Sequence, residues 1–239
     1  MQGWDSVLFL LLAYRGDPEA PRAIQHLVAQ NLTNYVQLVA NRTQPQTAIW
    51  DPKQKQLSVQ CHEGYKYVTA KIALGLRYLV TNFNFSILAK VDADTQFCKE
   101  AMPTIHDKFV YAGVFRRPSR VLMHAHRGQR KEWVDRGYVK LFNRTRYAKY
   151  ARGGGYVISY ELIAKTLPYF EWLSVQQLEE LRGEDAFVGL MVQRGPEIGL
   201  NVSYLELKAE TGPHLRFSPK PCNSTSFVFI HKLVWKSSS

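Results

Sequence analysis

A chain of 239 residues with 46% hydrophobic content can bury a full core, which excludes a disordered or fibrous protein and favours one large α/β domain over residues 1–239. The formal net charge of +11 favours anionic partners, such as nucleic acid, membrane headgroups, nucleotide diphosphates or acidic glycans. Charge alone does not choose among these classes.

The first part of the chain predicts a strand, a turn and a helix. The apolar run Val7–Ala13 is typical of a buried strand, Gly16-Asp17-Pro18 of a turn, and a helix is expected from Pro21 onward. The polar stretch Asn41–Lys55 predicts an exposed loop before a short strand at Leu57–Val59.

The stretch Ile87–Asp94 carries the clearest chemical signal. It follows a helix expected over Tyr65–Val80 and predicts a buried strand that delivers Asp92 and Asp94 on one side, because side chains in a strand alternate. Ligands bind at the carboxyl ends of strands in open α/β sheets, and two such oxygen ligands suit a hard divalent cation that also binds phosphate. The stretch indicates a metal-assisted nucleotide-sugar site, with a polar turn as the alternative.

A basic segment follows the strand expected at Phe109–Phe115. Lys and Arg residues are concentrated between Arg116 and Arg152 and are interleaved with aromatic side chains. This pattern is typical of a surface that tracks a nucleic-acid backbone, stacks sugar rings or is simply solvated.

The run Tyr150–Ser159 contains three consecutive glycines, which permit close approach of the backbone to a ligand. Ser159 is expected to cap the next helix. Further along, Glu184-Asp185 precede a helical segment, Ala186–Arg194, where acids ordinarily complement the helix dipole. Strands are expected at Leu200–Leu207 and Phe227–His231.

Six of the eight asparagines lie in Asn-x-Ser/Thr triplets, where random placement predicts fewer than one. This excess indicates a glycosylated protein of the secretory-pathway lumen and conflicts with a nucleic-acid partner, although Asn and Ser also cluster in turns. The sites are Asn31, Asn41, Asn84, Asn143, Asn201 and Asn223.

Three cysteines, Cys61, Cys98 and Cys222, permit one disulfide, and the sequence does not show which two pair. The most apolar run is far shorter than the roughly 20 residues that span a bilayer. For a lumenal protein we therefore expect a signal or anchor upstream of Met1.

Several of these motifs, in this order, resemble the β-1,3-galactosyltransferase family of Golgi glycosyltransferases. They are Lys90-Val-Asp-Ala-Asp94, the Tyr150–Ser159 run, Glu184-Asp185 and the segment Cys222–His231, and Tyr65–Lys71 echoes the family's Asp-x-Tyr-x-Asn-Leu-Thr-x-Lys. The run Gly-Gly-Gly-Tyr-Val-Ile-Ser looks most like the branch that builds the proteoglycan linkage region.

The resemblance implies a glycosyltransferase A fold, a single Rossmann-like domain with a central mixed, mostly parallel sheet flanked by helices. It implies Asp94 and His231 as ligands of Mn²⁺ and Asp185 as the general base. The donor-binding residues would be Asp92, Lys71 and Lys90. The cleft would be lined by Gly153, Gly154, Gly155, Tyr156 and Glu184.

Three departures from the family pattern are visible. Glu63 and Tyr67 stand where the family has Asp and Asn, and Asn41–Lys55 is longer than usual. The family's Arg-rich motif is not visible before Val7, which leaves open whether residues upstream of Met1 complete the nucleotide site.

The expected activity is inverting transfer of galactose from UDP-galactose to a 3-hydroxyl of an acceptor glycan, without a covalent intermediate. Related transferases that use UDP-GlcNAc or UDP-GalNAc, and a catalytically silent lumenal glycan-binding protein, are the alternatives. The resemblance also implies a Golgi-lumenal type II membrane protein whose acceptor is a glycan or glycoprotein, with the proteoglycan linkage region as one candidate.

Overall fold

The computed structural model describes residues 4–116, 119–121, 134–211, 222 and 228–231, and of residues 153, 209–211, 230 and 231 it describes the backbone alone. The described residues form an eight-stranded sheet in the order β3-β4-β2-β1-β5-β8-β7-β9. Four of its pairings are parallel and three antiparallel, which confirms the expected mixed, mostly parallel sheet. Its strands are β1 (Val7–Leu12), β2 (Tyr35–Ala40), β3 (Ala48–Asp51), β4 (Gln56–Val59), β5 (Ile87–Asp92), β7 (Val110–Arg116), β8 (Tyr150–Ser159) and β9 (Ser203–Glu206).

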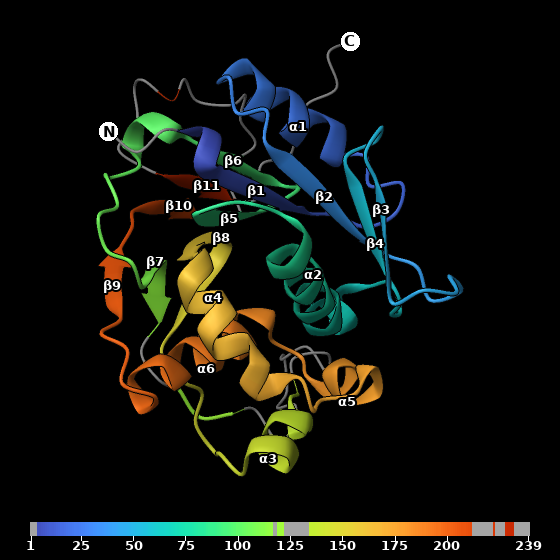
Figure 1. The fold of residues 1–239 in the computed structure, drawn as a ribbon, viewed down its shortest axis with the longest axis vertical. Coiled ribbons are helices and arrows are strands. Elements are labelled where there is room, and N and C mark those ends of the chain that lie inside the picture. The colour runs from blue at the N-terminus through green and yellow to red at the C-terminus, as the bar shows by residue number, and fades with distance from the viewer. Residues whose placement is uncertain (1–3, 117–118, 122–133, 212–221, 223–227, 232–239) are drawn as a thin grey trace.

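Helices and a smaller sheet cover the two faces of this sheet (Figure 1). On one face lie α2 (Val68–Asn82), α4 (Tyr160–Thr166) and α6 (Glu184–Glu197), with α3 (Arg136–Phe142) and α5 (Val175–Glu180) beyond them. On the other lie α1 (Ala20–Ala29) and a three-stranded sheet of β10 (Ala209–Thr211), β11 (Phe229–His231) and β6 (Thr95–Phe97). The α/β arrangement implied by the sequence is confirmed.

Strand β1 is apolar throughout because both of its faces are buried. Leu8 and Leu10 belong to the core beneath the helical layer, whereas Val7 and Phe9 belong to the core beneath the small sheet. A continuous apolar run is the expected pattern for a parallel strand covered on both sides.

The polar stretch Asn41–Lys55 is not wholly a loop, so that expectation was wrong in part. Strand β3 lies inside it and pairs with β4 as an antiparallel hairpin. The Asp51 carboxylate closes the turn by accepting the backbone N–H groups of Lys53 and Gln54. The Trp50 ring packs edge-on against Phe83, with 5.0 Å between ring centroids.

Ser159 precedes α4 as expected, but its hydroxyl does not cap the helix. The Ser159 hydroxyl instead accepts the backbone N–H of Val110 at 3.1 Å. The expected capping bond was wrong because a neighbouring strand supplies the donor.

The glycine run lies in β8, in the middle of the sheet, and its close approach is to another strand. A Cβ atom on Gly155 would lie 2.6 Å from the carbonyl oxygen of Lys90 and would overlap the Phe229 ring. Glycine is therefore needed there for the small sheet to pack on the large one.

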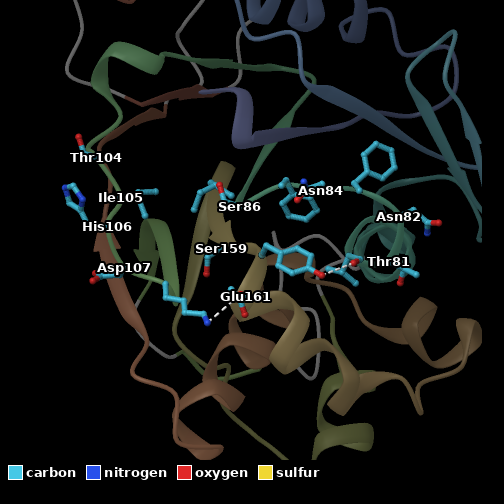
Figure 2. Close-up of a pocket in the computed structure, with 16 residues that line it drawn as sticks. Thr81, Asn82, Asn84, Ser86, Thr104, Ile105, His106, Asp107, Ser159 and Glu161 are labelled. Atoms are coloured by element: carbon cyan, nitrogen blue, oxygen red, sulfur yellow. Dashed lines mark hydrogen bonds and ion pairs between the residues drawn. The ribbon is translucent and has the colours of Figure 1, made fainter. Parts of the chain in front are cut away.

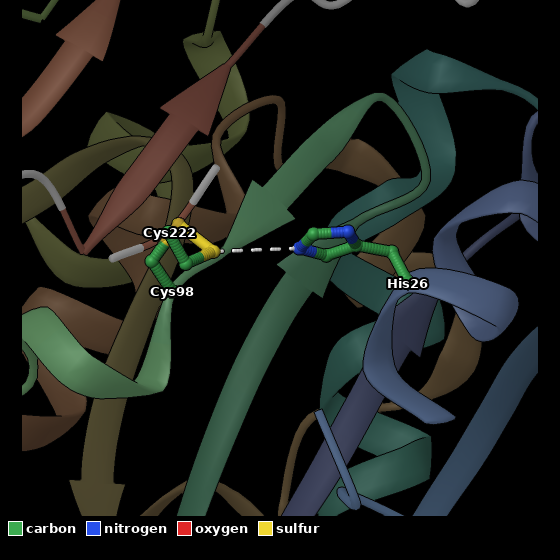
Figure 3. A group of neighbouring side chains, drawn as sticks. All are labelled: His26, Cys98 and Cys222. Atoms are coloured by element: carbon green, nitrogen blue, oxygen red, sulfur yellow. Dashed lines mark hydrogen bonds between the residues drawn. A yellow bond between two sulfur atoms is a disulfide. The ribbon is translucent and has the colours of Figure 1, made fainter. Parts of the chain in front are cut away.

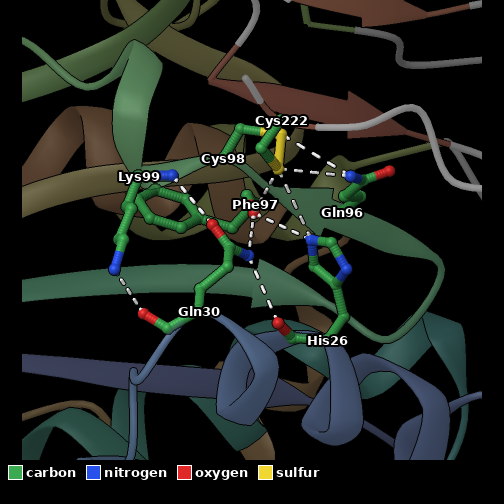
Figure 4. Close-up of a disulfide and its surroundings, with 7 residues drawn as sticks. All are labelled: His26, Gln30, Gln96, Phe97, Cys98, Lys99 and Cys222. Atoms are coloured by element: carbon green, nitrogen blue, oxygen red, sulfur yellow. Dashed lines mark hydrogen bonds between the residues drawn. A yellow bond between two sulfur atoms is a disulfide. The ribbon is translucent and has the colours of Figure 1, made fainter. Parts of the chain in front are cut away.

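The structure pairs Cys98 with Cys222 and leaves Cys61 free and buried. The bond joins the end of β6 to the segment before β11. Gln30, at the end of α1, holds the same region by donating to the Phe97 carbonyl and accepting from the Lys99 amide (Figure 4).

His26 Nε2 lies 3.7 Å from the Cys222 sulfur (Figure 3). Among the described residues, His26 and these cysteines form the one group of three potential metal ligands that gathers closely. Because the two sulfurs are bonded to each other, this group is a disulfide in contact with the His26 ring.

Five of the six sequons lie on the described part of the chain. Asn31, Asn84, Asn143 and Asn201 are exposed and Asn41 is half-buried, whereas Asn223 lies outside the described residues. Glycosylation of these sites stays a prediction. None of the described helices has the length and apolarity needed to cross a membrane.

The pairing predicts a thiol count. In denaturant without reductant, alkylation should label one cysteine per chain, Cys61, and peptide mapping should recover Cys98 linked to Cys222. After reduction all three should react. Alkylation of Cys98 or Cys222 in the unreduced protein would contradict the pairing.

Candidate active site

A cleft of about 960 Å³ opens at the carboxyl ends of β1 and β5. This edge is where open α/β sheets bind ligands, and the volume suits a small-molecule ligand. Polar and aromatic residues from five parts of the chain line it, among them Tyr14, Asp17, Glu19, Glu63, Tyr65, Lys71, Asp92, Asp94, Glu184 and Asp185.

Asp92 and Asp94 both face this cleft. Strand β5 ends at Asp92, so Ala93 and Asp94 belong to the turn before β6 rather than to the strand. The two carboxylates nevertheless line one cavity, as the sequence predicts. The polar turn and the acidic site are thus the same feature.

Lys90 lies beneath the carboxylates and its side chain is only 1% exposed. Its ammonium contacts Asp92 Oδ1 at 2.8 Å and Glu184 Oε1 at 2.7 Å. The Tyr156 ring lies 5.5 Å below the ammonium and is itself fully buried. Lys90 and Tyr156 therefore lie beneath the cleft. Tyr156 was expected to line the cleft, but its ring is buried under the Lys90 ammonium.

Burial by itself would lower the pKa of the Lys90 ammonium, but Asp92, Glu184 and Asp185 outweigh it and raise that pKa well above its ordinary value. Burial by itself would raise the pKa of the Glu184 carboxyl, but the charge of Lys90 outweighs burial and lowers that pKa below its ordinary value. Burial raises the pKa of Asp92 to about 6, although Lys90 opposes the change.

Asp185 differs sharply from its neighbour. Burial, and then the charge of Glu184, raise the pKa of Asp185 well above its ordinary value. Its Oδ1 atom is buried and has no hydrogen-bond partner in the part of the chain that the structure describes. Two adjacent carboxyls whose environments separate their pKa values are typical of acid–base sites.

Lys71 faces the cleft but is already engaged. Its ammonium donates to the Ala13 carbonyl at 2.8 Å and pairs with Glu63. Glu63 also accepts the backbone N–H groups of Ala40 and Arg15 at 3.1 and 3.3 Å. This pair ties the ends of β1 and β2 to α2, so the Glu63 departure from the family pattern has a structural role.

Two exposed aromatic side chains at the cleft were not singled out from the sequence. Tyr14 is 47% exposed and Tyr65 is 66% exposed, and both line the cavity. Their positions in the sequence could have indicated them, because Tyr14 directly follows the first expected strand and Tyr65 begins the segment that resembles the family motif. Tyr67, the other departure from the family pattern, stacks on His62 with 4.7 Å between ring centroids.

The backbone of His231 pairs with Thr95, the residue after Asp94, so the register places residue 231 beside the turn that holds Asp94. The described side chains do not gather three metal-ligating groups around Asp94. Two carboxylates facing an open cleft still fit the oxygen chemistry that Mn²⁺ prefers. Asp94 and Asp92, with His231, are the residues that would hold the ion.

The glycines that were expected to line the cleft lie within the sheet. Gly154 and Gly155 are buried within β8, and Gly153 lies on the same strand. Part of the basic segment between Arg116 and Arg152, residues 117–118 and 122–133, lies outside the described residues.

A second cleft, of about 980 Å³, opens at the opposite end of β5 and β8 (Figure 2). Its ion pair, Lys108 with Glu161, is separated by 3.6 Å and is exposed. Among its lining residues are the exposed Asn84, His106 and Asp107, and it has no buried carboxylate comparable with Asp185. The first cleft, which holds Asp92, Asp94, Glu184 and Asp185 and is called the acidic cleft below, is therefore the better candidate for catalysis.

Sequence comparison decides the family. Residues 55–198, more than half of the chain, match the family model for galactosyltransferases. The chain belongs to the galactosyltransferase family. The match contains Asp92, Asp94 and Asp185. No functionally curated protein gives a significant match to this sequence.

Three solved structures are similar to this chain at low identity. The catalytic domain of Drosophila β1,4-galactosyltransferase 7, in complex with xylobiose, shares 12% identity and a TM-score of 0.38, with 83% of this chain and 64% of that chain covered. A glycosyltransferase involved in glycosylation of the major capsid of PBCV-1 shares 8% identity with a TM-score of 0.41, and the alignment covers 96% of this chain and 94% of that chain. A nucleoside-diphosphate-sugar pyrophosphorylase from Vibrio cholerae RC9 shares 11% identity with a TM-score of 0.41, and the alignment covers 84% of this chain and 91% of that chain. The family assignment rests on the sequence match alone.

The raised pKa of Asp185 predicts a stability effect. A carboxyl whose folded-state pKa is raised contributes stability below its ordinary pKa and loses it as pH rises through the folded value. In metal-free protein, Asp185→Asn should therefore raise the free energy of unfolding at pH 8 by at least about 1 kcal/mol. The gain should shrink toward pH 4.

Denaturant unfolding across this pH range measures the effect. Asp107→Asn, at an exposed aspartate of the second cleft, is the matched control and should give no gain. A gain for Asp185→Asn that does not change with pH would contradict the assigned electrostatics.

Proposed function

We propose that this member of the galactosyltransferase family is an inverting, Mn²⁺-dependent enzyme that transfers galactose from UDP-galactose to a 3-hydroxyl of an acceptor glycan. One observation supports the proposal most strongly. The Asp185 side chain lines the same cleft as Asp92 and Asp94, and its buried Oδ1 atom has no hydrogen-bond partner among the described residues.

The aspartate side of the cleft would bind the donor. Asp94, with His231, would hold the metal ion, and Asp92 would contact the donor ribose or the metal's surroundings. A bound Mn²⁺ supplies charge neutralisation for the departing diphosphate. The carboxyl end of β1, fixed by Lys71 and Glu63, would form the adjoining wall.

Asp185 would act as the general base. Its raised pKa makes it a better proton acceptor than an ordinary aspartate, and its Oδ1 atom has no hydrogen-bond partner among the described residues. The hydroxyl oxygen attacks the anomeric carbon, its proton passes to Asp185, and the bond to the UDP oxygen breaks. A single displacement inverts the anomeric configuration.

A lumenal compartment is part of the proposal. Four sequons lie on exposed residues, and a disulfide joins Cys98 to Cys222, which is typical of oxidising compartments. We infer a Golgi-lumenal enzyme, anchored through a segment upstream of Met1, that acts on glycans or glycoproteins. The proteoglycan linkage region is the acceptor suggested by the glycine-run motif.

The function is tested by measuring turnover of a UDP-sugar panel with and without Mn²⁺. We expect UDP-galactose to be the preferred donor, turnover to require the metal, and product NMR to show a β-1,3 linkage. Preference for UDP-GlcNAc or UDP-GalNAc would move the enzyme to a related specificity. No turnover of any donor would favour a silent glycan-binding protein.

Asp94→Ala should abolish metal-dependent binding of UDP. The remaining carboxylate and one imidazole cannot replace the lost charge beside a diphosphate. Calorimetric titration of UDP in the presence of Mn²⁺ measures this, with Asp107→Ala as the control on an exposed aspartate. Unchanged affinity in Asp94→Ala would remove Asp94 from the site.

Asp185→Asn should lower turnover by about 10² to 10⁴, the usual contribution of a general base, while UDP binding stays nearly intact. The amide keeps the shape of the carboxylate but cannot accept the proton. Steady-state kinetics and calorimetry on one preparation separate the two effects. Near-normal turnover would assign the base to Glu184 or to another group.

A further inference from the structure

We propose that Lys90 is a positioning residue of the transfer reaction, one that holds the amino end of α6, and with it Asp185, against β5, the strand that ends at Asp92 and leads into Asp94. This inference rests on the proposed function, in which Asp185 is the base. It assigns Lys90 a role through other residues and not through contact with the donor.

The geometry of the ammonium carries the proposal. Lys90 and Glu184 are 94 positions apart in the chain, yet Lys90 Nζ donates to Glu184 Oε1 at 2.7 Å. The same ammonium pairs with Asp92 Oδ1 at 2.8 Å. One buried cation therefore bridges β5, which bears Asp92, and α6, which bears Asp185.

In the described part of the chain, no side chain caps the start of helix α6. Gly183 occupies the N-cap position and has no side chain to cap the helix. The first two helical residues are Glu184 and Asp185. The contact from Lys90 to Glu184 therefore fixes the residue next to the base, which sets where the Asp185 carboxylate lies.

Charge balance makes this contact hard to replace. Asp92, Asp94, Glu184 and Asp185 are among the carboxylates that line the cleft, and the ammonium of Lys71 is already paired with Glu63. Removal of one partner from a buried ion pair leaves an uncompensated charge, which is strongly unfavourable. Without Lys90, repulsion between Asp92 and Glu184 would push α6 away from β5.

Direct donor binding by Lys90 fits the structure less well. The side chain is 1% exposed, and two carboxylates and the Tyr156 ring already surround its ammonium. A phosphate could reach it only by displacing Asp92 or Glu184.

The pH profile gives a readout that a merely structural role would not move. The groups that face Asp185 are Glu184 on α6, Lys90 and Asp92 on β5, Tyr65 before α2, Tyr111 on β7 and Tyr156 on β8. Lys90 favours ionised Asp185, whereas Glu184 disfavours it. Removal of the Lys90 charge should therefore raise the pKa of Asp185, and removal of the Glu184 charge should lower it.

The experiment compares Lys90→Met and Glu184→Gln with wild type in Mn²⁺-dependent galactose transfer. Both variants should lose roughly tenfold to a hundredfold in turnover, as expected for a displaced catalytic group, with little change in the donor Michaelis constant. The acid limb of the turnover profile should move up by about one pH unit in Lys90→Met and down by about one in Glu184→Gln. Lys108→Met, which removes an exposed lysine paired with Glu161, should match wild type.

Three results would overturn the proposal. They are acid limbs that move in the same direction, acid limbs that do not move, and a Lys90→Met variant that loses donor affinity with turnover intact. If Lys90→Met does not fold, turnover of Glu184→Gln decides, because this variant removes the Lys90–Glu184 ion pair and leaves Lys90 paired with Asp92. Near-normal turnover in Glu184→Gln would overturn the proposal. Near-normal turnover in Asp185→Asn would instead show that the proposed base is wrong, which separates the failure of the proposed function from that of Lys90.

Discussion

The acidic cleft depends on one buried cation, the Lys90 ammonium, that holds carboxylates from two elements together. A buried charge is tolerated only when it is paired, and Lys90 is paired with both Asp92 and Glu184. The same cation separates the properties of adjacent acids, because it keeps Glu184 ionised while Asp185, buried beside that charge, has a raised pKa. Structural support and acid–base tuning thus come from a single side chain.

The layer beneath the cleft explains why that contact can form. Gly155 lets Phe229 pack directly on β8, and Tyr156, the next residue, places its ring under Lys90. The packed small sheet also brings the backbone of His231 opposite Thr95, and the Cys98–Cys222 bond fastens both strands at their other ends. The residues of β8 therefore help to position both the Asp92–Asp94 side and the Asp185 side of the acidic cleft.

Much of the fold and the main acidic residues were predictable from sequence, because alternation and apolar runs report burial directly. Asp92, Asp94 and Asp185 do meet in one cleft. The roles of Lys90 and Tyr156 were not predictable, since sequence does not show that a lysine in an apolar strand has its partner 94 positions away. Strand β3 was missed because Trp50 gains its packing partner, Phe83, only in the folded protein. The cysteine pairing likewise depends on tertiary proximity.

Crystals grown with UDP and Mn²⁺, with anomalous diffraction recorded at the manganese edge, test the central claim most directly. The account predicts a manganese peak bound to Asp94 and the UDP diphosphate in the acidic cleft, with Lys90 still paired to Asp92 and Glu184. Manganese and UDP bound elsewhere, for example in the cleft lined by His106 and Asp107, would contradict it.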